Sequence, residues 1–206
     1  MAEIHPANTL FQTWIDLRIE TMTNKEKKHL QKASRLLAQV LRHTPEMLGL
    51  RLDANGWIDT ELLLTALDVI GLPVSKEQLE LIVEISDKSR FTLTADGTRI
   101  RAAQGHSIAV DLGVPSREPP EILYHGTATQ NVVSIMRKGL VPNGRQQVHL
   151  SRDKDTARTV GSRHGDPIVL LVDSAGMYAN GNAFYQADNG VWLTDHVPPT
   201  FIRPPE

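Results

Sequence analysis

The sequence predicts an α+β protein with two lobes of different texture. In the first half, amphipathic helical patterns are followed by a single β-hairpin. In the second half, short apolar strands alternate with short helices. A looser stretch punctuated by prolines separates the two halves, and we place the boundary there. The expected division is an N-terminal extension (1–23), a first lobe (24–107), a linker (108–119) and a second lobe (120–206).

The N-terminal extension has two interpretations that the sequence leaves open. Phe11, Trp14 and Ile15 fit one face of a helix, but the segment also fits a loosely attached tail. Met22 directly precedes a much stronger helix start, so translation beginning there is an alternative.

The first strong helix is predicted from Asn24 to about Arg42. Apolar residues recur there at helical spacing, namely Leu30, Ala33, Leu37, Val40 and Leu41. Pro45 disfavours helix in the residue before it, so Arg42 and His43 are expected at the helix end. Residues 24–51 hold seven Lys or Arg against two Glu, a block that either attracts polyanions or is a solvated helix face.

The rest of the first lobe is predicted as helices and a hairpin. We expect a strand at 56–58, a helix at 60–70 closed by Gly71, and a helix begun by a Ser75–Gln78 capping box that buries Leu79, Ile82 and Val83. Alternation at 91–95, a turn at Asp96-Gly97 and a return at 98–102 predict the hairpin. Helices followed by a terminal hairpin are typical of a winged-helix arrangement, which commonly contacts nucleic acid.

The second lobe is predicted from short alternating segments. Expected strands lie at 122–126, 148–151 and 168–172, expected helices at 129–138 and 153–162, and further short strands near 184–185, 191–193 and 201–202.

Composition excludes several classes of chemistry. The chain has 206 residues, a formal net charge of −2 and no cysteine, which excludes disulfides, thiolate metal ligands and cysteine nucleophiles. We expect a cytoplasmic protein without a membrane partner, since no apolar run is long enough to cross a bilayer and no signal pattern begins the chain. Gly-x-Ser-x-Gly, Gly-x-Gly-x-x-Gly and Walker motifs are absent.

Four basic residues stand where elements end: Arg42, His43, Arg90 and Arg145. Side chains at such positions can converge on a ligand. The planar guanidinium of arginine suits phosphate oxygens. Each residue taken singly fits a surface position with weak ion pairs equally well.

Three histidines have small polar neighbours: His106, His125 and His149. A structural histidine is the usual explanation for one such residue. A zinc site is the alternative, but no acidic or cysteine ligand completes its spacing, so no metal is expected.

Six segments in order resemble the RNA 2′-phosphotransferase family (Tpt1/KptA) between about residues 30 and 202. They are Leu41-Arg42-His43, Asn55-Gly56-Trp57, Arg90-Phe91, Gly105-His106-Ser107, Leu123-Tyr124-His125-Gly126-Thr127 and Val148-His149-Leu150-Ser151. The resemblance implies an N-terminal winged-helix lobe that binds RNA and a C-terminal ADP-ribosyltransferase-like lobe that binds NAD.

The resemblance also implies the reaction. The RNA 2′-phosphate attacks NAD and displaces nicotinamide, which gives an ADP-ribosylated 2′-phosphate. Transesterification then yields 2′-hydroxyl RNA and ADP-ribose 1″,2″-cyclic phosphate. The implied substrates are 2′-phosphorylated RNA, of the kind that tRNA splicing leaves, and NAD. We expect a monomeric enzyme, and the residue inventory indicates no need for a metal.

Residue roles follow from the same match. Arg42, His43, Arg90 and Arg145 form the implied catalytic set, in which Arg42 and Arg90 straddle the two lobes to clamp phosphate and Arg145 serves the second step. The implied NAD-binding residues are His106, Ser107, His125, Gly126, Thr127, His149 and Ser151. Residues 189–193 lack the carboxylate that many protein-modifying ADP-ribosyltransferases carry on a late strand.

Two other functions stay open at this point. The protein ADP-ribosylates a terminal phosphate of nucleic acid or another acceptor and stops there, or it is a winged-helix nucleic-acid binder without enzyme activity.

Overall fold

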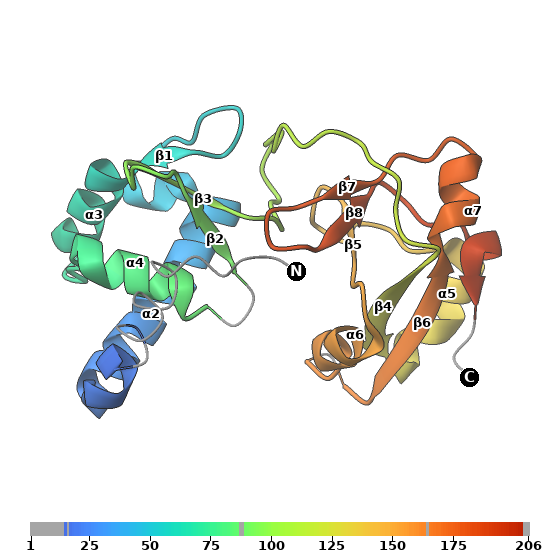
Figure 1. The fold of residues 1–206 in the computed structure, drawn as a ribbon, viewed down its shortest axis with the longest axis horizontal. Coiled ribbons are helices and arrows are strands. Elements are labelled where there is room, and N and C mark those ends of the chain that lie inside the picture. Colours follow the sequence, from blue (N-terminus) through green and yellow to red (C-terminus); the bar gives the residue numbers. More distant parts are fainter. Residues whose placement is uncertain (1–14, 16, 87–88, 164, 204–206) are drawn as a thin grey trace, which may run out of the picture.

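The computed structural model describes Ile15 and residues 17–86, 89–163 and 165–203. It is an α+β structure with two lobes side by side along the longest axis (Figure 1). Each lobe has its own apolar core, one drawn from residues between Ile15 and Ala102 and the other from residues between Leu123 and Ile202.

The first lobe, which we call the N-terminal lobe, packs helices α2, α3 and α4 against a three-stranded antiparallel sheet of order β1-β3-β2. Its elements are α2 (Asn24–Arg42), η1 (Pro45–Leu48), β1 (Ile58–Asp59), α3 (Thr60–Val69), α4 (Lys76–Glu84), β2 (Phe91–Leu93) and β3 (Arg99–Ala102). The core lies between the helices and the sheet, where Leu37, Leu41 and Ile100 are fully buried.

Capping explains where the helices of this lobe begin. The predicted Ser75–Gln78 capping box at the start of α4 is confirmed, and Thr23 with Glu26 forms a second one at the start of α2. α4 buries Leu81 with Leu79 and Ile82, whereas Val83 is only half-buried, so its apolar face is turned slightly from the predicted one.

Two details differ from the sequence-based expectation. The strand expected at 56–58 begins only at Ile58, because the Asp53 carboxylate accepts the backbone N–H groups of Asn55 and Trp57 and folds the preceding residues into a turn. Ile15 is buried in the N-terminal core and residues 17–21 are helical, whereas Phe11 and Trp14 lie outside the described residues.

The second lobe, which we call the C-terminal lobe, contains two three-stranded antiparallel sheets with orders β4-β6-β9 and β5-β8-β7. Its elements are β4 (Ile122–Ala128), η2 (Thr129–Asn131), α5 (Val132–Lys138), β5 (Val148–Leu150), α6 (Lys154–Gly161), β6 (Pro167–Asp173), α7 (Ser174–Ala179), β7 (Tyr185–Gln186), β8 (Trp192–Thr194), η3 (Pro199–Phe201) and β9 (Ile202–Arg203). The predicted strands and two helices are present, while α7 is an element that the sequence pattern did not indicate.

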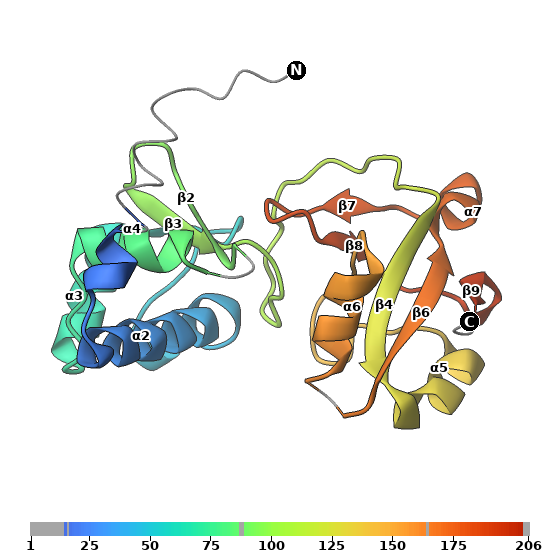
Figure 2. The same ribbon diagram turned by 60° about the horizontal axis from the view of Figure 1, so that its bottom comes forward.

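The two lobes are arranged so that α2 ends toward the second lobe. In Figure 2, α2 runs across the N-terminal lobe and its C-terminal end faces the side of the C-terminal lobe that carries α6. The segment between the lobes is tied to the second one, since the Arg117 backbone N–H donates to the Phe184 carbonyl at 2.9 Å. Within the described residues, no helix is long and apolar enough to cross a membrane.

Candidate active site

Arg42 lies half-buried in the last turn of α2, beside the loop that leads into β2. Its Nη2 donates to the Arg90 carbonyl oxygen at 3.5 Å, and its buried Nε has no hydrogen-bond partner among the described residues. Burial lowers the pKa of Arg42 to about 10, with repulsion from Arg145 and Arg90 as further causes. Arg42 therefore lies within electrostatic range of both Arg145 and Arg90.

Arg90 approaches the same place from the residue before β2. Its Nη1 donates to Ser34 Oγ on α2 at 3.4 Å, and its backbone carbonyl accepts both the Arg42 side chain and the Ala103 N–H. Arg42 and Arg90 thus both project from the N-terminal lobe. Both lie within residues 24–107, the predicted bounds of that lobe, and their role as a phosphate clamp at the lobe boundary stays a prediction.

Arg145 brings the contribution of the C-terminal lobe. It lies exposed on the loop before β5, where partial desolvation lowers its pKa. The same loop is tied to the N-terminal lobe, because the Gln146 N–H donates to the His106 carbonyl at 3.0 Å. It is therefore Arg145 that completes the cluster from across the lobe boundary.

The loop Gly105–Ser107 joins these parts. The Ser107 N–H donates to the Arg42 carbonyl at 3.0 Å, and Ser107 Oγ is hydrogen-bonded to His43 Nδ1 at 2.9 Å. Gly105 has φ +92°, a backbone conformation that glycine adopts without strain, and it lies against the Arg42 side chain. His43 itself is exposed, and partial burial with the charges of Arg42 and Arg145 lowers its pKa.

The central residue of this loop, His106, is buried, with only 3% of its surface exposed. Its Nε2 lies 3.4 Å from where a Cβ on Gly56 would be, so two of the segments noted in the sequence pack directly on each other. Burial, followed by the charges of Arg42 and Arg101, lowers the pKa of His106 to about 4. The ring is therefore neutral near pH 7.

His149 on β5 faces the arginine cluster. Burial, followed by repulsion from Arg145 and Arg42, lowers its pKa to about 3, so the ring is neutral near pH 7. Its buried Nε2 has no hydrogen-bond partner among the described residues. His125 on β4 lies next to it, with Nδ1 donating to the His149 carbonyl at 3.2 Å. His149 therefore keeps a neutral imidazole nitrogen that no described residue pairs.

Gly126, Thr127 and Ser151 occupy close-packed positions around β4. A Cβ on Gly126 would overlap the Ala157 carbonyl of α6, so only glycine lets the helix lie this close to the strand. Thr127 is buried. Ser151 and Tyr124 exchange two backbone hydrogen bonds at 2.8 and 2.9 Å, which joins the end of β5 to β4.

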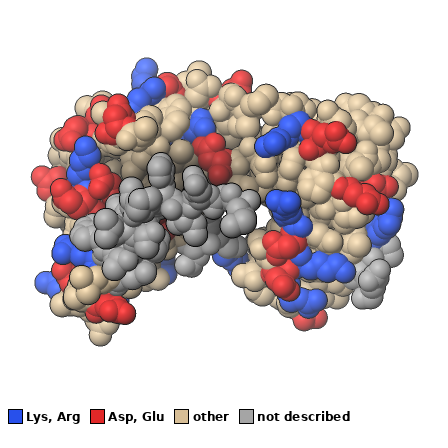
Figure 3. Space-filling model, in the orientation of Figure 1, with Lys and Arg blue, Asp and Glu red and all other residues tan. Residues whose placement is uncertain are grey.

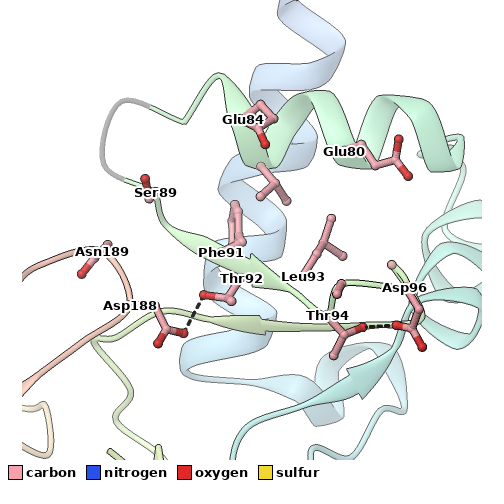
Figure 4. A pocket seen from close by; sticks show the side chains of 13 residues that line it. Glu80, Glu84, Ser89, Phe91, Thr92, Leu93, Thr94, Asp96, Asp188 and Asn189 are labelled. Carbon is pink, nitrogen blue, oxygen red and sulfur yellow. Dashed lines mark hydrogen bonds between the residues drawn. The ribbon is translucent and has the colours of Figure 1, made fainter. Parts of the chain in front are cut away.

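A second contact between the lobes was not found from the sequence. Asp188, in the turn before β8, accepts from Arg101 Nη2 at 2.8 Å and from Thr92 Oγ1 at 2.9 Å (Figure 4). Arg101 is 8% exposed and its guanidinium lies 4.5 Å from the centre of the Trp57 ring. Arg101 and Asp188 are 87 residues apart in the chain, and no local pattern signals such a pair.

The groove beside this contact has a different character from the arginine cluster. It has a volume of about 580 Å³ and is lined by α4, the hairpin and the Asp188 turn. Glu80, Glu84, Asp96 and Asp188 contribute carboxylates, and its described lining holds no Lys, Arg or His (Figure 4). Such a lining disfavours an anionic ligand. Neither here nor in the rest of the described chain are three or more His, Cys, Asp or Glu placed to hold a metal ion.

Comparison with known proteins gives consistent matches over most of the chain. Residues 28–196 match the model of the "RNA 2'-phosphotransferase, Tpt1 / KptA family". A probable RNA 2′-phosphotransferase of Agrobacterium fabrum is 56% identical over 169 residues, covering 82% of this chain and 91% of that one. Proteins with the same description from Pseudomonas fluorescens and Streptomyces coelicolor are 50% and 46% identical, covering 86% and 87% of this chain and 98% of each relative.

Proposed function

The chain belongs to the Tpt1/KptA family of RNA 2′-phosphotransferases, and we propose that it performs this reaction at the cluster of Arg42, His43, Arg90 and Arg145. The protein is an enzyme that removes a 2′-phosphate from RNA. The residues 24–107 form the proposed winged-helix, RNA-binding lobe, and residues 120–206 the proposed ADP-ribosyltransferase-like, NAD-binding lobe.

One observation carries the proposal. Arg42 lies near both Arg90 and Arg145, and buried nitrogen atoms beside them have no hydrogen-bond partner among the described residues. Like charges within range of one another are unfavourable unless an anion joins them. Arg42 Nε and His149 Nε2 are buried without partners, a condition that costs about 1–3 kcal/mol per group unless a ligand supplies the hydrogen bond. A phosphate dianion supplies the charge and an acceptor oxygen for Arg42 Nε, whereas the neutral His149 ring is left for a hydrogen-bond donor on NAD.

The arginines of the N-terminal lobe fit the first step. A phosphate monoester has a second pKa of about 6, so it is mostly dianionic at neutral pH. It therefore needs no general base to attack NAD. What it needs is orientation, and the Arg42 and Arg90 guanidinium groups hold it from two directions. Their hydrogen bonds to Ser34 Oγ and to the Arg90 carbonyl keep the two side chains in place.

Arg145 and His43 fit the second step. Negative charge develops at phosphorus during transesterification, and Arg145 approaches it from the other lobe. His43 is held at Nδ1 by Ser107, which leaves Nε2 for a phosphate oxygen. Because the pKa of His43 is lowered, the neutral ring prevails at physiological pH.

The C-terminal lobe fits NAD, which supplies the ribose that receives the phosphate. His149 offers an unpaired, buried Nε2, and His125 lies against its backbone. We place Ser151 and Thr127 around the same pocket, with Gly126 setting its depth through the contact of β4 with α6. His106 and Ser107 contribute to the pocket indirectly, because their loop holds His43 and the loop of Arg145 in place. The absence of cysteine suits the reducing cytoplasm, where we place the enzyme as a monomer that needs no metal.

The test uses purified protein, an oligonucleotide with one internal 2′-phosphate and NAD. We expect conversion to 2′-hydroxyl RNA only when NAD is present, with the same rate in excess chelator. A stable ADP-ribosylated RNA as the end product would support the transferase alternative. Tight RNA binding without nicotinamide release would support a binding protein and contradict the proposal.

A further inference from the structure

One face of α2 carries a basic stripe that runs along the helix to the site. Its members are spaced alternately by four and three residues, which places them on one side of the helix: Lys28, Lys32, Arg35, Gln39 and Arg42. Lys28, Lys32, Arg35 and Gln39 are exposed. The buried residues of α2 lie on the opposite side of the same helix. In Figure 2, α2 lies at the front of the N-terminal lobe.

The positive charge of this stripe is not neutralised locally. Lys28, Lys32 and Arg35 make no ion pair within the described part of the chain. Glu26, the acid within α2, is occupied by the capping box with Thr23. Three exposed cations on one helix face, none of them in an ion pair with a described residue, present a positive surface that attracts a polyanion.

The charge of the N-terminal lobe is divided between two sides. In Figure 4 the acidic groove opens in front of α4 and β2, and α2 passes behind them. On the face shown in Figure 3, Lys and Arg are interspersed with Asp and Glu over both lobes. A nucleic acid strand is therefore directed away from the groove and toward the stripe of α2.

The stripe also leads into the arginine cluster. Arg35 follows Ser34, whose hydroxyl accepts a hydrogen bond from Arg90 Nη1 at 3.4 Å. Arg42 is the last member of the stripe. From Lys28 to Arg42 the helix rises roughly 21 Å, a length that spans several phosphates of a single strand.

We propose that Lys28, Lys32 and Arg35 form a track for the RNA strand, binding backbone phosphates on one side of the 2′-phosphorylated nucleotide. This inference rests on the proposed function, since it assigns the path of the same substrate. The track contributes affinity for longer RNA and takes no part in the chemical steps. Flexible Lys and Arg heads on an exposed helix bind phosphates without reading bases.

The experiment compares two 2′-phosphorylated substrates, a dinucleotide and an oligonucleotide of about twelve nucleotides. The dependence of KM on salt concentration reports how many phosphates the protein contacts. The test variant carries Lys28→Gln, Lys32→Gln and Arg35→Gln. The control variant removes the same charge elsewhere through Lys76→Gln, Arg137→Gln and Lys138→Gln, all at exposed positions.

For the longer RNA we expect the test variant to raise KM at least about ten-fold. The slope of log KM against log salt should fall by roughly 2, because each of the three lost phosphate contacts on a single strand contributes about 0.7. Its kcat, and both parameters for the dinucleotide, should stay within about two-fold of the parent. The control variant should match the parent on both substrates.

Two results would overturn the track. One is an unchanged KM and salt slope on the longer RNA, and the other is an equal loss on both substrates by a variant whose unfolding curve matches that of the parent. If the triple variant unfolds, Lys28→Gln alone, at the far end of the stripe, decides by the same comparison. Failure of the parent to act on either substrate with NAD would instead contradict the proposed function.

Discussion

At the scale of single residues, the site depends on polar groups that the protein leaves incompletely paired. Arg42 and His149 each keep a buried nitrogen without a partner, although both take part in other interactions. Sequence reasoning alone marked Arg42, Arg90 and Arg145 only as basic residues at element ends. Their selection came from the family resemblance, and their mutual approach came from the structure.

Replacing Arg90 with lysine tests whether the guanidinium geometry matters. Lysine keeps the charge but has no planar fork, so Arg90→Lys should lose the Ser34 contact and one phosphate hydrogen bond. Loss of a charged hydrogen bond of about 1.5–3 kcal/mol lowers kcat/KM by about ten- to a hundred-fold. Steady-state kinetics measure the effect, with Arg99→Lys, exposed and paired with Asp53, as the control. A loss below about two-fold would argue against Arg90 as a bidentate clamp.

The low pKa of His149 predicts a pH dependence of stability. The folded state holds this pKa at about 3, whereas the ordinary value is 6.5, so between these pH values the unfolded state binds one more proton. Stability therefore falls as pH is lowered from 6.5 toward 3, by up to about 1.4 kcal/mol per pH unit. His149→Asn should remove up to this much of the slope of the unfolding free energy against pH. Urea unfolding at pH 6.5, 5.5 and 4.5 measures that slope. Parallel curves for parent and variant would show that His149 is not held neutral.

At the scale of elements, the contact of β4 with α6 shapes the lobe that we assign to NAD. Gly126 on β4 and Gly161 on α6 both lie where a Cβ would collide with backbone of the other element. Sequence pattern predicted both elements, because apolar runs and an Asp153 cap are local signals. It did not predict their close approach, which depends on residues more than 30 positions apart.

Gly126→Ala tests this contact. The added methyl group overlaps the Ala157 carbonyl, and the backbone must move to relieve it. We expect a loss of about 3 kcal/mol in the free energy of unfolding and a raised KM for NAD. Gly144→Ala is the matched control, since it has open space and only the strain of φ +83°, worth roughly 1–2 kcal/mol. Equal losses in the two variants would contradict the packing argument.

Two further elements show which structures a local sequence pattern can and cannot predict. α7 was missed because its six residues, Ser174–Ala179, are too few to show a helical repeat, and its start relies on the Asp173 side chain accepting from the Gly176 N–H. The hairpin was found because Asp96-Gly97 is a strong turn signal, and Gly97 indeed has φ +68°.

At the scale of the whole molecule, catalysis as proposed requires the two lobes to keep one orientation. Hydrogen bonds between described residues of the two lobes include the Gln146–His106 backbone bond and the bonds of Asp188 with Arg101 and Thr92. The sequence predicts two lobes, and the boundary at residues 108–119 stays a prediction. It gave no indication of these bonds, since each joins residues from opposite sides of the linker.

Asp188→Asn tests the orientation of the lobes. The change removes the charge that pairs with Arg101, a nearly buried cation, while keeping the size of the side chain. We expect kcat/KM to fall about ten-fold, equivalent to about 1.4 kcal/mol, because Arg145 and Arg42 no longer keep a fixed separation. Asp53→Asn, which weakens a pair within the N-terminal lobe, is the control and should stay within about two-fold. Equal effects of both changes would argue that Asp188 serves stability alone.

The central claim is that the arginine cluster transfers a 2′-phosphate from RNA to NAD. The most direct measurement is a single-turnover reaction in which nicotinamide, 2′-hydroxyl RNA and ADP-ribose 1″,2″-cyclic phosphate are quantified together by mass spectrometry. We predict equal amounts of the three products in the parent and strong loss of all three in Arg42→Ala. Release of inorganic phosphate without NAD, or nicotinamide release with the 2′-phosphate left on the RNA, would contradict the claim.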